Sequence, residues 1–426
     1  MSNLQPFLLP EKLGLGCATA ATQIEGGTTD NSWYAWAKKA KKIKDGSSPS
    51  RGNQHWELYE EDIQLMAELG IKHYRMGIEW SRIEPTQGNF DQAAIEHYRE
   101  ELKLLLQYKI EPLLTLHHFS NPSWFEEQGA FSKSSAVPIF LAYVTFVVEQ
   151  LQDLCTAFVT INEPNIYVTN GYIYGQWPPG KKSFFTAMRV MKNLTLCHLA
   201  AYQEIHRIYG EKKVLVGFAN HLRVFEGYNK NPIYQLEAKI MEYLFQGAIT
   251  KSMSTGKLAF PLGISAPYGK GKYYDYIGIN YYSRSAIKHF REYVLPNRPT
   301  NDLGWDIYPE GLTILCQAQY KKYQAPIWIT ENGTCDRTDS FRSLFIYEHI
   351  KQIVEHQLPV ERYYHWTLMD NFEWSEGESA AFGLVQCDFE TQKRTIRSSG
   401  NFYSTMLKTR QVNKQMILEY LASKDS

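Results

Sequence analysis

Short apolar segments alternate with longer amphipathic segments along the whole of this chain. Each short segment closes on polar residues, as a buried parallel strand does where it reaches a loop. The segments predicted to be strands lie at 13–20, 73–80, 111–118, 158–164, 214–220, 276–282, 326–333 and 362–370. The segments between them show the periodicity of amphipathic helices, most clearly at 56–70, 93–108, 137–154 and 184–210.

Eight strands joined by helical crossovers predict an α/β fold that closes into a (β/α)₈ TIM barrel. An open, doubly wound sheet is the alternative, and it normally carries a glycine-rich phosphate loop after an early strand. The early segment GLGCATAA at 14–21 does not have the G-x-G-x-x-G pattern followed by a helix. Because no linker rich in Pro, Gly or Ser divides the chain, we expect one barrel domain over residues 1–426.

Polar residues stand at the end of every predicted strand. The active site of a barrel lies at the carboxyl ends of its strands, so these residues are expected to share one polar pocket. They are Gln23 and Glu25, Arg75 and Glu79, His117 and His118, Asn162 and Glu163, Asn220 and His221, Asn280 and Tyr282, Glu331 and Asn332, and the run from Asp370 to Trp374. Such a pocket indicates a polar ligand.

Charge and hydropathy narrow the class of ligand. The 45 Lys and Arg residues balance the 45 Asp and Glu residues, so neither nucleic acid nor an anionic membrane is an expected partner. With 29 Tyr and 10 Trp, the chain offers the flat apolar faces that bind sugar rings.

Residues 1–16 lack a signal-peptide pattern and no long apolar stretch follows, so we expect a cytoplasmic protein. The sequence carries no signal for an oligomeric state.

Two carboxylates stand out among the strand ends. Glu163 lies in TINEP at the end of the fourth predicted strand, and Glu331 lies in ITENG at the end of the seventh. Glycoside hydrolysis requires two carboxyl groups across the scissile bond, one to move a proton and one to attack or to direct water. Residues so far apart in sequence meet only if the barrel closes, so the pair also tests the fold.

Seven motifs in this chain resemble those of family 1 glycoside hydrolases, the β-glucosidases and β-galactosidases. The motifs are GCATAATQIEGG, HYRMGIEWSRIEP, TLHH, TINEP, GINYY, ITENG and HWTLMDNFEW, in the family's order and over nearly the whole chain. The resemblance implies a retaining β-glycosidase with Glu163 as acid/base and Glu331 as nucleophile. It implies a small β-glycoside or oligosaccharide substrate, most simply a β-glucoside but also a β-galactoside or β-fucoside, and neither a metal nor a cofactor.

The resemblance also implies three groups of residues around the two carboxylates. The residues expected to hydrogen-bond to or stack on the sugar are Gln23, His118, Asn162, Glu373 and Trp374. The residues expected to contact the nucleophile are Arg75 and Tyr282. The residues expected to complete the pocket are Asn280 and Trp366, with Trp305 on the aglycone side and Phe382 in the wall. Since adjacent strand residues point to opposite sides, only one of His117 and His118 can face the pocket, and we assign His118.

The two carboxylates need different protonation states. A guanidinium such as Arg75 and a hydroxyl such as Tyr282 are expected to keep the pKa of Glu331 low. The charge of Glu331 is expected to raise the pKa of Glu163 until the nucleophile is glycosylated, after which Glu163 can act as a base.

Some positions depart from the family pattern. Phe119 and Asn165 stand where Trp is common, and Arg397 and Phe402 stand where Lys and Trp are frequent. These changes bear on aglycone preference more than on chemistry. One alternative is a 6-phospho-β-glycosidase, but such enzymes hold phosphate with Ser and Lys near the position of Glu373, where a carboxylate repels it. Another is a non-catalytic sugar-binding protein on the same barrel, against which both carboxylates argue.

Overall fold

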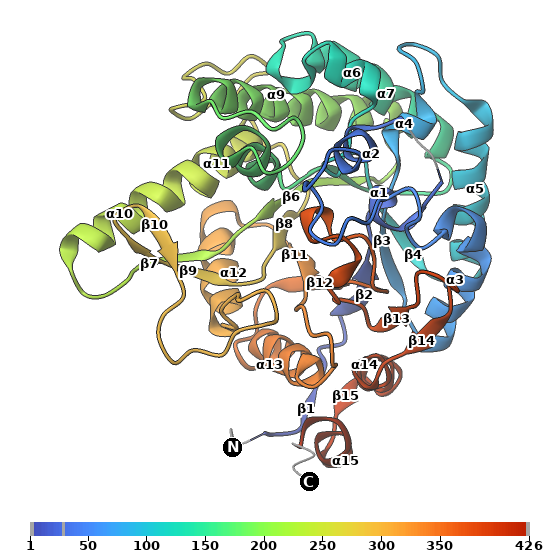
Figure 1. Ribbon diagram of the computed structural model, residues 1–426, viewed down its shortest axis with the longest axis vertical. Coiled ribbons are helices and arrows are strands. Elements are labelled where there is room, and N and C mark those ends of the chain that lie inside the picture. Colours follow the sequence, from blue (N-terminus) through green and yellow to red (C-terminus); the bar gives the residue numbers. More distant parts are fainter. Residues whose placement is uncertain (1–3, 28–29, 423–426) are drawn as a thin grey trace.

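The computed structural model describes residues 4–27 and 30–422 and contains a closed barrel of parallel strands (Figure 1). The barrel strands are β2 (Gly14–Ala18), β3 (His73–Gly77), β4 (Glu111–Thr115), β5 (Ala157–Asn162), β6 (Leu215–His221), β8 (Ile277–Asn280), β11 (Ile327–Asn332) and β12 (Val360–Trp366). They follow the chain order around the barrel, and β12 closes it by pairing with β2. The predicted TIM barrel is therefore confirmed and the open sheet is excluded.

Each predicted strand segment overlaps one barrel strand. Seven of the eight segments ran past the carboxyl end of the strand, whereas the segment at 214–220 stopped one residue short of the end of β6. The surplus residues belong to the loops that carry the polar clusters, where apolar and polar residues mix. The four clearest predicted helices are α3 (His55–Leu69), α5 (Gln92–Gln107), α7 (Ala136–Leu151) and α9 (Phe184–Tyr209). The expectation of one domain over 1–426 stays a prediction, and its residues 1–3, 28–29 and 423–426 lie outside the described residues.

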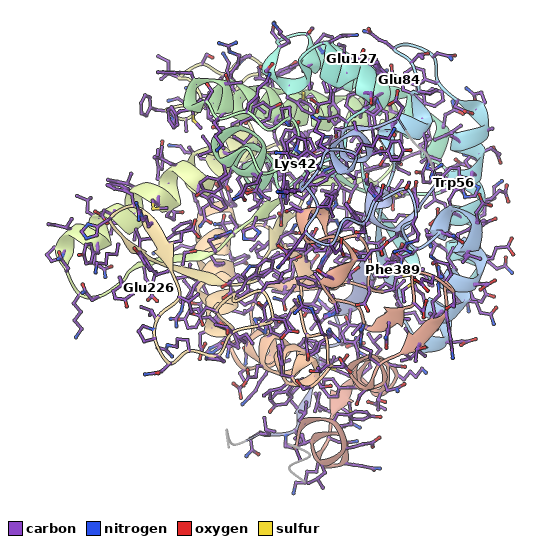
Figure 2. The ribbon with its side chains drawn as sticks, in the orientation of Figure 1. Lys42, Trp56, Glu84, Glu127, Glu226 and Phe389 are labelled. Carbon is purple, nitrogen blue, oxygen red and sulfur yellow. The ribbon has the colours of Figure 1, made fainter. Side chains whose placement is uncertain are left out.

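Local sequence explains where these elements begin and end. Asp91 caps α5, because its carboxylate accepts the amide hydrogens of Ala93 and Ala94 at 2.8 and 3.1 Å. Gly70 ends α3 with a φ of 81°, a conformation that costs glycine little. Every residue of β5 and of β11 is buried, as in a parallel sheet covered on both faces. Side chains fill the space between the barrel and its helices (Figure 2).

A small accessory sheet beside the barrel was not predicted. It consists of β7 (Val224–Gly227), β9 (Arg284–Lys288) and β10 (Arg291–Tyr293), and α10 (Pro232–Glu242) packs against it on the left of Figure 1. Glu226 of β7, labelled in Figure 2, pairs with Arg284 of β9 at 3.1 Å. None of these strands reads as a buried apolar run, because β7 is mostly only half-buried, β10 is exposed and β9 begins with Arg284 and Ser285, yet they border the carboxyl end of the barrel.

Two kinds of feature are not found among residues 4–27 and 30–422. No helix in this part of the chain is long and apolar enough to cross a membrane. Nor does this part group three or more His, Cys, Asp or Glu side chains in a way that could hold a metal ion.

Candidate active site

A cavity of about 890 Å³ opens at the carboxyl ends of the barrel strands. The predicted site residues that line it are His118, Glu163, Tyr282, Trp305, Glu331, Trp366, Glu373, Trp374 and Phe382. Four other predicted residues are fully buried and are not among those that line it: Gln23, Arg75, Asn162 and Asn280. The structure thus brings the predicted set together in two layers, a lining and a supporting layer behind it.

Glu331, near the end of β11, is held through both of its carboxylate oxygens. Arg75 donates from Nη1 to Oε1 at 2.5 Å, and the hydroxyl of Tyr282 donates to Oε2 at 2.6 Å. Burial, reinforced by the charge of Glu331, raises the pKa of Tyr282 well above its usual value, so the phenol remains a donor. The carboxylate therefore has a fixed orientation toward the cavity.

Arg75 itself is immobilised by residues from three other strands. Its Nε donates to Thr115 Oγ1 at 3.0 Å, and its Nη2 donates to Asn162 Oδ1 at 2.7 Å. Its Nη1 also donates to the backbone oxygen of Thr330 at 3.1 Å. The only charge in contact with Glu331 within the described residues is thus a guanidinium whose position the barrel determines.

Glu163 follows β5 and precedes the short helix α8 (Pro164–Val168). Its φ of 41° is a left-handed conformation that is unusual for a side chain of this type. Asn280 Nδ2 lies 2.8 Å from Oε1, and His221 Nδ1 lies 3.2 Å from the same oxygen. The turn after the strand and these two contacts place the carboxyl at the cavity.

The pKa values of both carboxyls depart from the ordinary value of a glutamate. Burial raises the pKa of Glu163 to about 7, against the opposing effects of Asn280 and Arg75. Burial also raises the pKa of Glu331 to about 7, although Arg75 and Tyr282 lower it and the charge of Glu163 raises it further. The expectation of a low pKa for Glu331 was wrong, because burial outweighs its two partners. The pair is therefore poised to hold one proton near neutral pH.

Glu373 and Gln23 form a third polar group at the cavity. Gln23 donates from Nε2 to Glu373 Oε2 at 3.2 Å and to the backbone oxygen of Phe372 at 2.8 Å. The buried Oε1 of Gln23 has no hydrogen-bond partner within the described part of the chain. Burial raises the pKa of Glu373 to about 8, while Gln23 and Trp366 oppose that rise. This group offers both acceptors and donors to a ligand with hydroxyls.

His118 lies between two indole rings at the cavity wall. Its ring stacks on Trp366 at 5.8 Å and on Trp374 at 5.7 Å between ring centroids, and Asn162 Nδ2 donates to its Nε2 at 3.0 Å. His117 instead packs edge-on against Phe131 in the core. Of the two histidines, the structure thus places His118 at the cavity.

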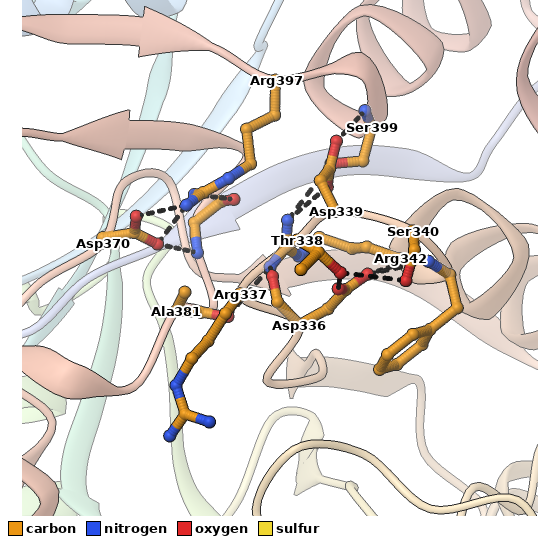
Figure 3. A network of polar contacts seen from close by, with 12 residues as sticks. Asp336, Arg337, Thr338, Asp339, Ser340, Arg342, Asp370, Ala381, Arg397 and Ser399 are labelled. Carbon is orange, nitrogen blue, oxygen red and sulfur yellow. Dashed lines mark hydrogen bonds and ion pairs between the residues drawn. The ribbon is translucent and has the colours of Figure 1, made fainter.

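Two arginines of the polar network in Figure 3 hold the loop that carries Glu373 and Trp374. Arg397 pairs with Asp370 at 2.7 Å, at the start of that loop. Arg342 donates to the backbone oxygen of Ala381 at 2.8 Å and so fixes the end of the same segment. Arg397, which departs from the family pattern, thus has a structural partner.

The outer part of the cavity mixes apolar side chains with polar and charged ones, such as Asn170, Gln176 and Glu292. Trp305 packs near Tyr282 and Phe382, with ring centroids 5.7 and 5.9 Å away, and is 36% exposed. Other apolar residues of the lining are Phe119, Ile166, Tyr174, Trp177, Met241, Phe245, Phe290, Tyr293, Val294 and Leu303. Such a surface suits an apolar or aromatic group attached to a sugar.

The family resemblance assigns no role to His221 or Arg223, although His221 was expected at the shared polar pocket as a strand-end residue. Both line the cavity, and His221 is within hydrogen-bond reach of Glu163. His221 was visible as a polar strand end, but it lies in none of the motifs that carried the resemblance. Arg223 follows the strand, and no pattern marked it.

Comparisons with known proteins agree with this geometry. The family model described as Glycosyl hydrolase family 1 matches residues 6–261 and 270–412. Beta-glucosidase A of Thermotoga maritima is 28% identical over 95% of this chain and 98% of its own length. A beta-galactosidase of Pyrococcus woesei is 28% identical over 92% of this chain and 95% of its own. The solved structure of a beta-glycosidase from Pyrococcus horikoshii has a TM-score of 0.90 and 32% identity, covering 98% of both chains.

Proposed function

Because the chain belongs to glycosyl hydrolase family 1, we propose that it is a retaining β-glycosidase that removes terminal, non-reducing β-D-glycosyl residues. The membership makes the protein a glycoside hydrolase, and the proposal adds the mechanism and the residues. One observation carries it: two buried carboxyls line the same cavity, and of the two only Glu331 contacts a guanidinium in the described structure.

In the first step, an oxygen of Glu331 attacks the anomeric carbon and forms a glycosyl ester. At the same time Glu163 gives its proton to the glycosidic oxygen, and the bond from that oxygen to the anomeric carbon breaks. Arg75 and Tyr282 favour this assignment, because their donors orient the attacking carboxylate. The aglycone leaves as a neutral alcohol toward the outer part of the cavity.

In the second step, water attacks the anomeric carbon from the side that the aglycone has left. Glu163 takes the proton from that water, and the bond to Glu331 breaks, so the product keeps the β configuration. The ester removes the negative charge of Glu331. The pKa of Glu163 then falls, because an anion on Glu163 no longer faces a second anion.

Sugar recognition is assigned to the inner part of the cavity. Glu373 and Trp374 line it there, and Gln23 lies behind Glu373 and donates to its carboxyl. We propose a β-glucoside as the main substrate, with β-galactoside and β-fucoside as further substrates. The names of the Thermotoga and Pyrococcus relatives support a β-glucoside and a β-galactoside. The mixed outer lining of the cavity suits an aglycone with an apolar part.

Azide rescue of two alanine variants tests the two roles separately. In Glu331→Ala the cavity left by the side chain admits azide, which attacks directly and gives the α-azide by inversion. In Glu163→Ala a dinitrophenyl glycoside still forms the ester, because its leaving group needs no proton, and azide then gives the β-azide with retention. Proton NMR of the products reads the anomers. The opposite pattern of anomers would reverse the assignment, and α-azide from both variants would exclude the covalent intermediate.

A further inference from the structure

The two donors near Glu163 converge on one of its oxygens. Asn280 Nδ2 and His221 Nδ1 both approach Oε1, at 2.8 and 3.2 Å. Among the residues that the structure describes, no side chain or backbone group hydrogen-bonds to Oε2. A carboxyl whose Oε1 accepts two hydrogen bonds carries its proton on Oε2, so the direction of proton transfer depends on these donors.

His221 can donate from Nδ1 only in one tautomer, and its neighbour selects that tautomer. Arg223 Nη2 lies 3.1 Å from His221 Nε2. A guanidinium has donors and no acceptor, so Nε2 must accept and the ring proton must sit on Nδ1. Burial and the charge of Arg223 lower the pKa of His221 well below its usual value, so the ring stays neutral.

Arg223 is in turn held by the accessory sheet. Its Nη1 donates to Glu292 of β10 at 2.7 Å, and its guanidinium lies over the ring of Phe245, 4.9 Å from the centroid. Glu292 also accepts a hydrogen bond from Ser285 of β9 at 2.8 Å. A continuous line of contacts therefore runs from the accessory sheet to Glu163.

We propose that Arg223 and His221 are positioning residues for Glu163: Arg223 fixes the His221 tautomer that donates to Oε1, which leaves Oε2 to carry the proton toward the glycosidic oxygen. The proposal rests on the role of Glu163 proposed above. The competing explanation is packing alone, since the His221 ring also stacks on Tyr282 at 5.7 Å and 15°.

Three variants separate hydrogen bonding from packing. His221→Phe keeps a ring on Tyr282 and removes both nitrogens. His221→Asn keeps an N–H donor near the Nδ1 position that needs no tautomer. Arg223→Met removes the donors and the charge, and Arg207→Met is its matched control, because Arg207 pairs with Glu204 on the outer surface of α9.

Leaving-group dependence is the main measurement. We expect His221→Phe and Arg223→Met to lower kcat/KM for phenyl β-glucoside at least about 10-fold, within the range that general acid catalysis contributes. For dinitrophenyl β-glucoside, which needs no acid, we expect a change below about 2-fold, by the same reasoning. His221→Asn should restore most of the activity on the phenyl substrate. In that background, Arg223→Met should have little further effect.

The pH profile gives a second measurement of Arg223→Met. The ionisable groups around Glu163 are His221 and Arg223 near the end of β6, Arg75 of β3, Tyr282 after β8, Glu331 of β11 and Glu373 after β12. Arg223→Met removes a cation near Glu163 and, through the tautomer of His221, a hydrogen-bond donor to the Glu163 carboxylate. Both losses raise the pKa of Glu163, so the alkaline limb of the pH profile of kcat/KM should move to higher pH. Arg207→Met should leave it in place.

The tautomer of His221 can also be observed directly in the wild-type protein. A long-range ¹H–¹⁵N spectrum of the wild-type protein labelled at its 12 histidines should show the His221 proton on Nδ1, assigned by its absence from His221→Asn. A proton on Nε2, or equal losses on the two substrates, would overturn the proposal. Glu163→Ala serves as the reference: if its kcat/KM, which reports formation of the ester, fell equally on both substrates, the role of Glu163 itself would fail, which is a separate result.

Discussion

The hydroxyl of Tyr282 donates to Oε2 of Glu331 at 2.6 Å, from the loop that follows β8, the barrel strand next to β11. Arg75 donates to the other oxygen, Oε1, at 2.5 Å, so each carboxylate oxygen accepts a hydrogen bond from a different side chain. A nucleophile fixed in this way attacks from one direction. The hydrogen bond from Tyr282 also stabilises the charged form of Glu331 and so opposes the rise in its pKa that burial causes. The position of Tyr282 therefore affects the pH range in which Glu331 is ionised.

Tyr282→Phe removes the donor and keeps the ring. We expect kcat/KM to fall by about 100-fold, as when one preorganised donor is lost from an active site. The nucleophile must be ionised, and loss of the donor raises the pKa of Glu331 above its present value of about 7. The acidic limb of the pH profile should therefore move to higher pH. The control is Tyr281→Phe, whose hydroxyl donates to a backbone oxygen instead, and an unmoved acidic limb in Tyr282→Phe would contradict the prediction.

The barrel was predictable because its strands are buried on both faces. Each reads as an apolar run, and each ends in polar residues because the strand ends there meet a cavity. The accessory sheet was not predictable, since β10 has only three residues and all are exposed. The accessory sheet holds Arg223 through the ion pair between Glu292 and Arg223, and only the tertiary structure brings these two residues together.

The candidate site was also predictable only in part. Glu163, Glu331 and the residues around them lie in motifs, so their positions could be predicted from a resemblance. The pKa of Glu331 could not, because it is set by how completely the carboxyl is removed from water. Nor could the tautomer of His221, since it depends on a residue two positions away that folds back onto the ring.

The separation of the two carboxyls predicts the stereochemistry. We expect the carboxyl carbons of Glu163 and Glu331 to lie about 5–5.5 Å apart, because a retaining enzyme leaves no room for water between nucleophile and substrate. A crystal structure with a bound transition-state analogue measures this distance. A separation of about 9 Å with the analogue in place would indicate inversion instead.

Glu373 is expected to discriminate against phosphorylated sugars. Burial raises the pKa of Glu373 to about 8, so this carboxyl is ionised only above that pH, where a phosphate dianion in the cavity would face its negative charge. One such repulsion amounts to about 2–4 kcal/mol near a protein surface, so above about pH 8 we expect turnover of an aryl β-glucoside to exceed that of its 6-phosphate by at least about 100-fold. Glu373→Gln, which keeps an acceptor and loses the charge, should narrow that ratio. Faster turnover of the phosphate by the wild type would exclude the role.

A buried charge cluster remote from the cavity predicts how stability depends on pH. His55 of α3 lies 2.7 Å from Asp62 and 3.0 Å from Glu101, and Asp62 also pairs with Arg394 at 2.9 Å. Burial opposes the charge of His55, but the hydrogen bonds to the two carboxylates outweigh it and raise its pKa to about 10. The ring is therefore a cation in the folded protein at neutral pH.

His55→Gln should destabilise the protein by about 3 kcal/mol near pH 6, because it leaves the buried Glu101 without its cation and Asp62 with Arg394 alone. The unfolded histidine has a pKa of about 6.5, so the folded state binds the extra proton between about pH 6.5 and 10. The contribution of His55 is therefore complete below about pH 6.5 and declines as pH rises toward 10. Urea unfolding at pH 6 and at pH 9.5 measures the deficit of the variant, which should be smaller at the higher pH. The exposed His356→Gln serves as control and should show little deficit at either pH, whereas an equal deficit of His55→Gln at both would mean that His55 acts by packing and not by charge.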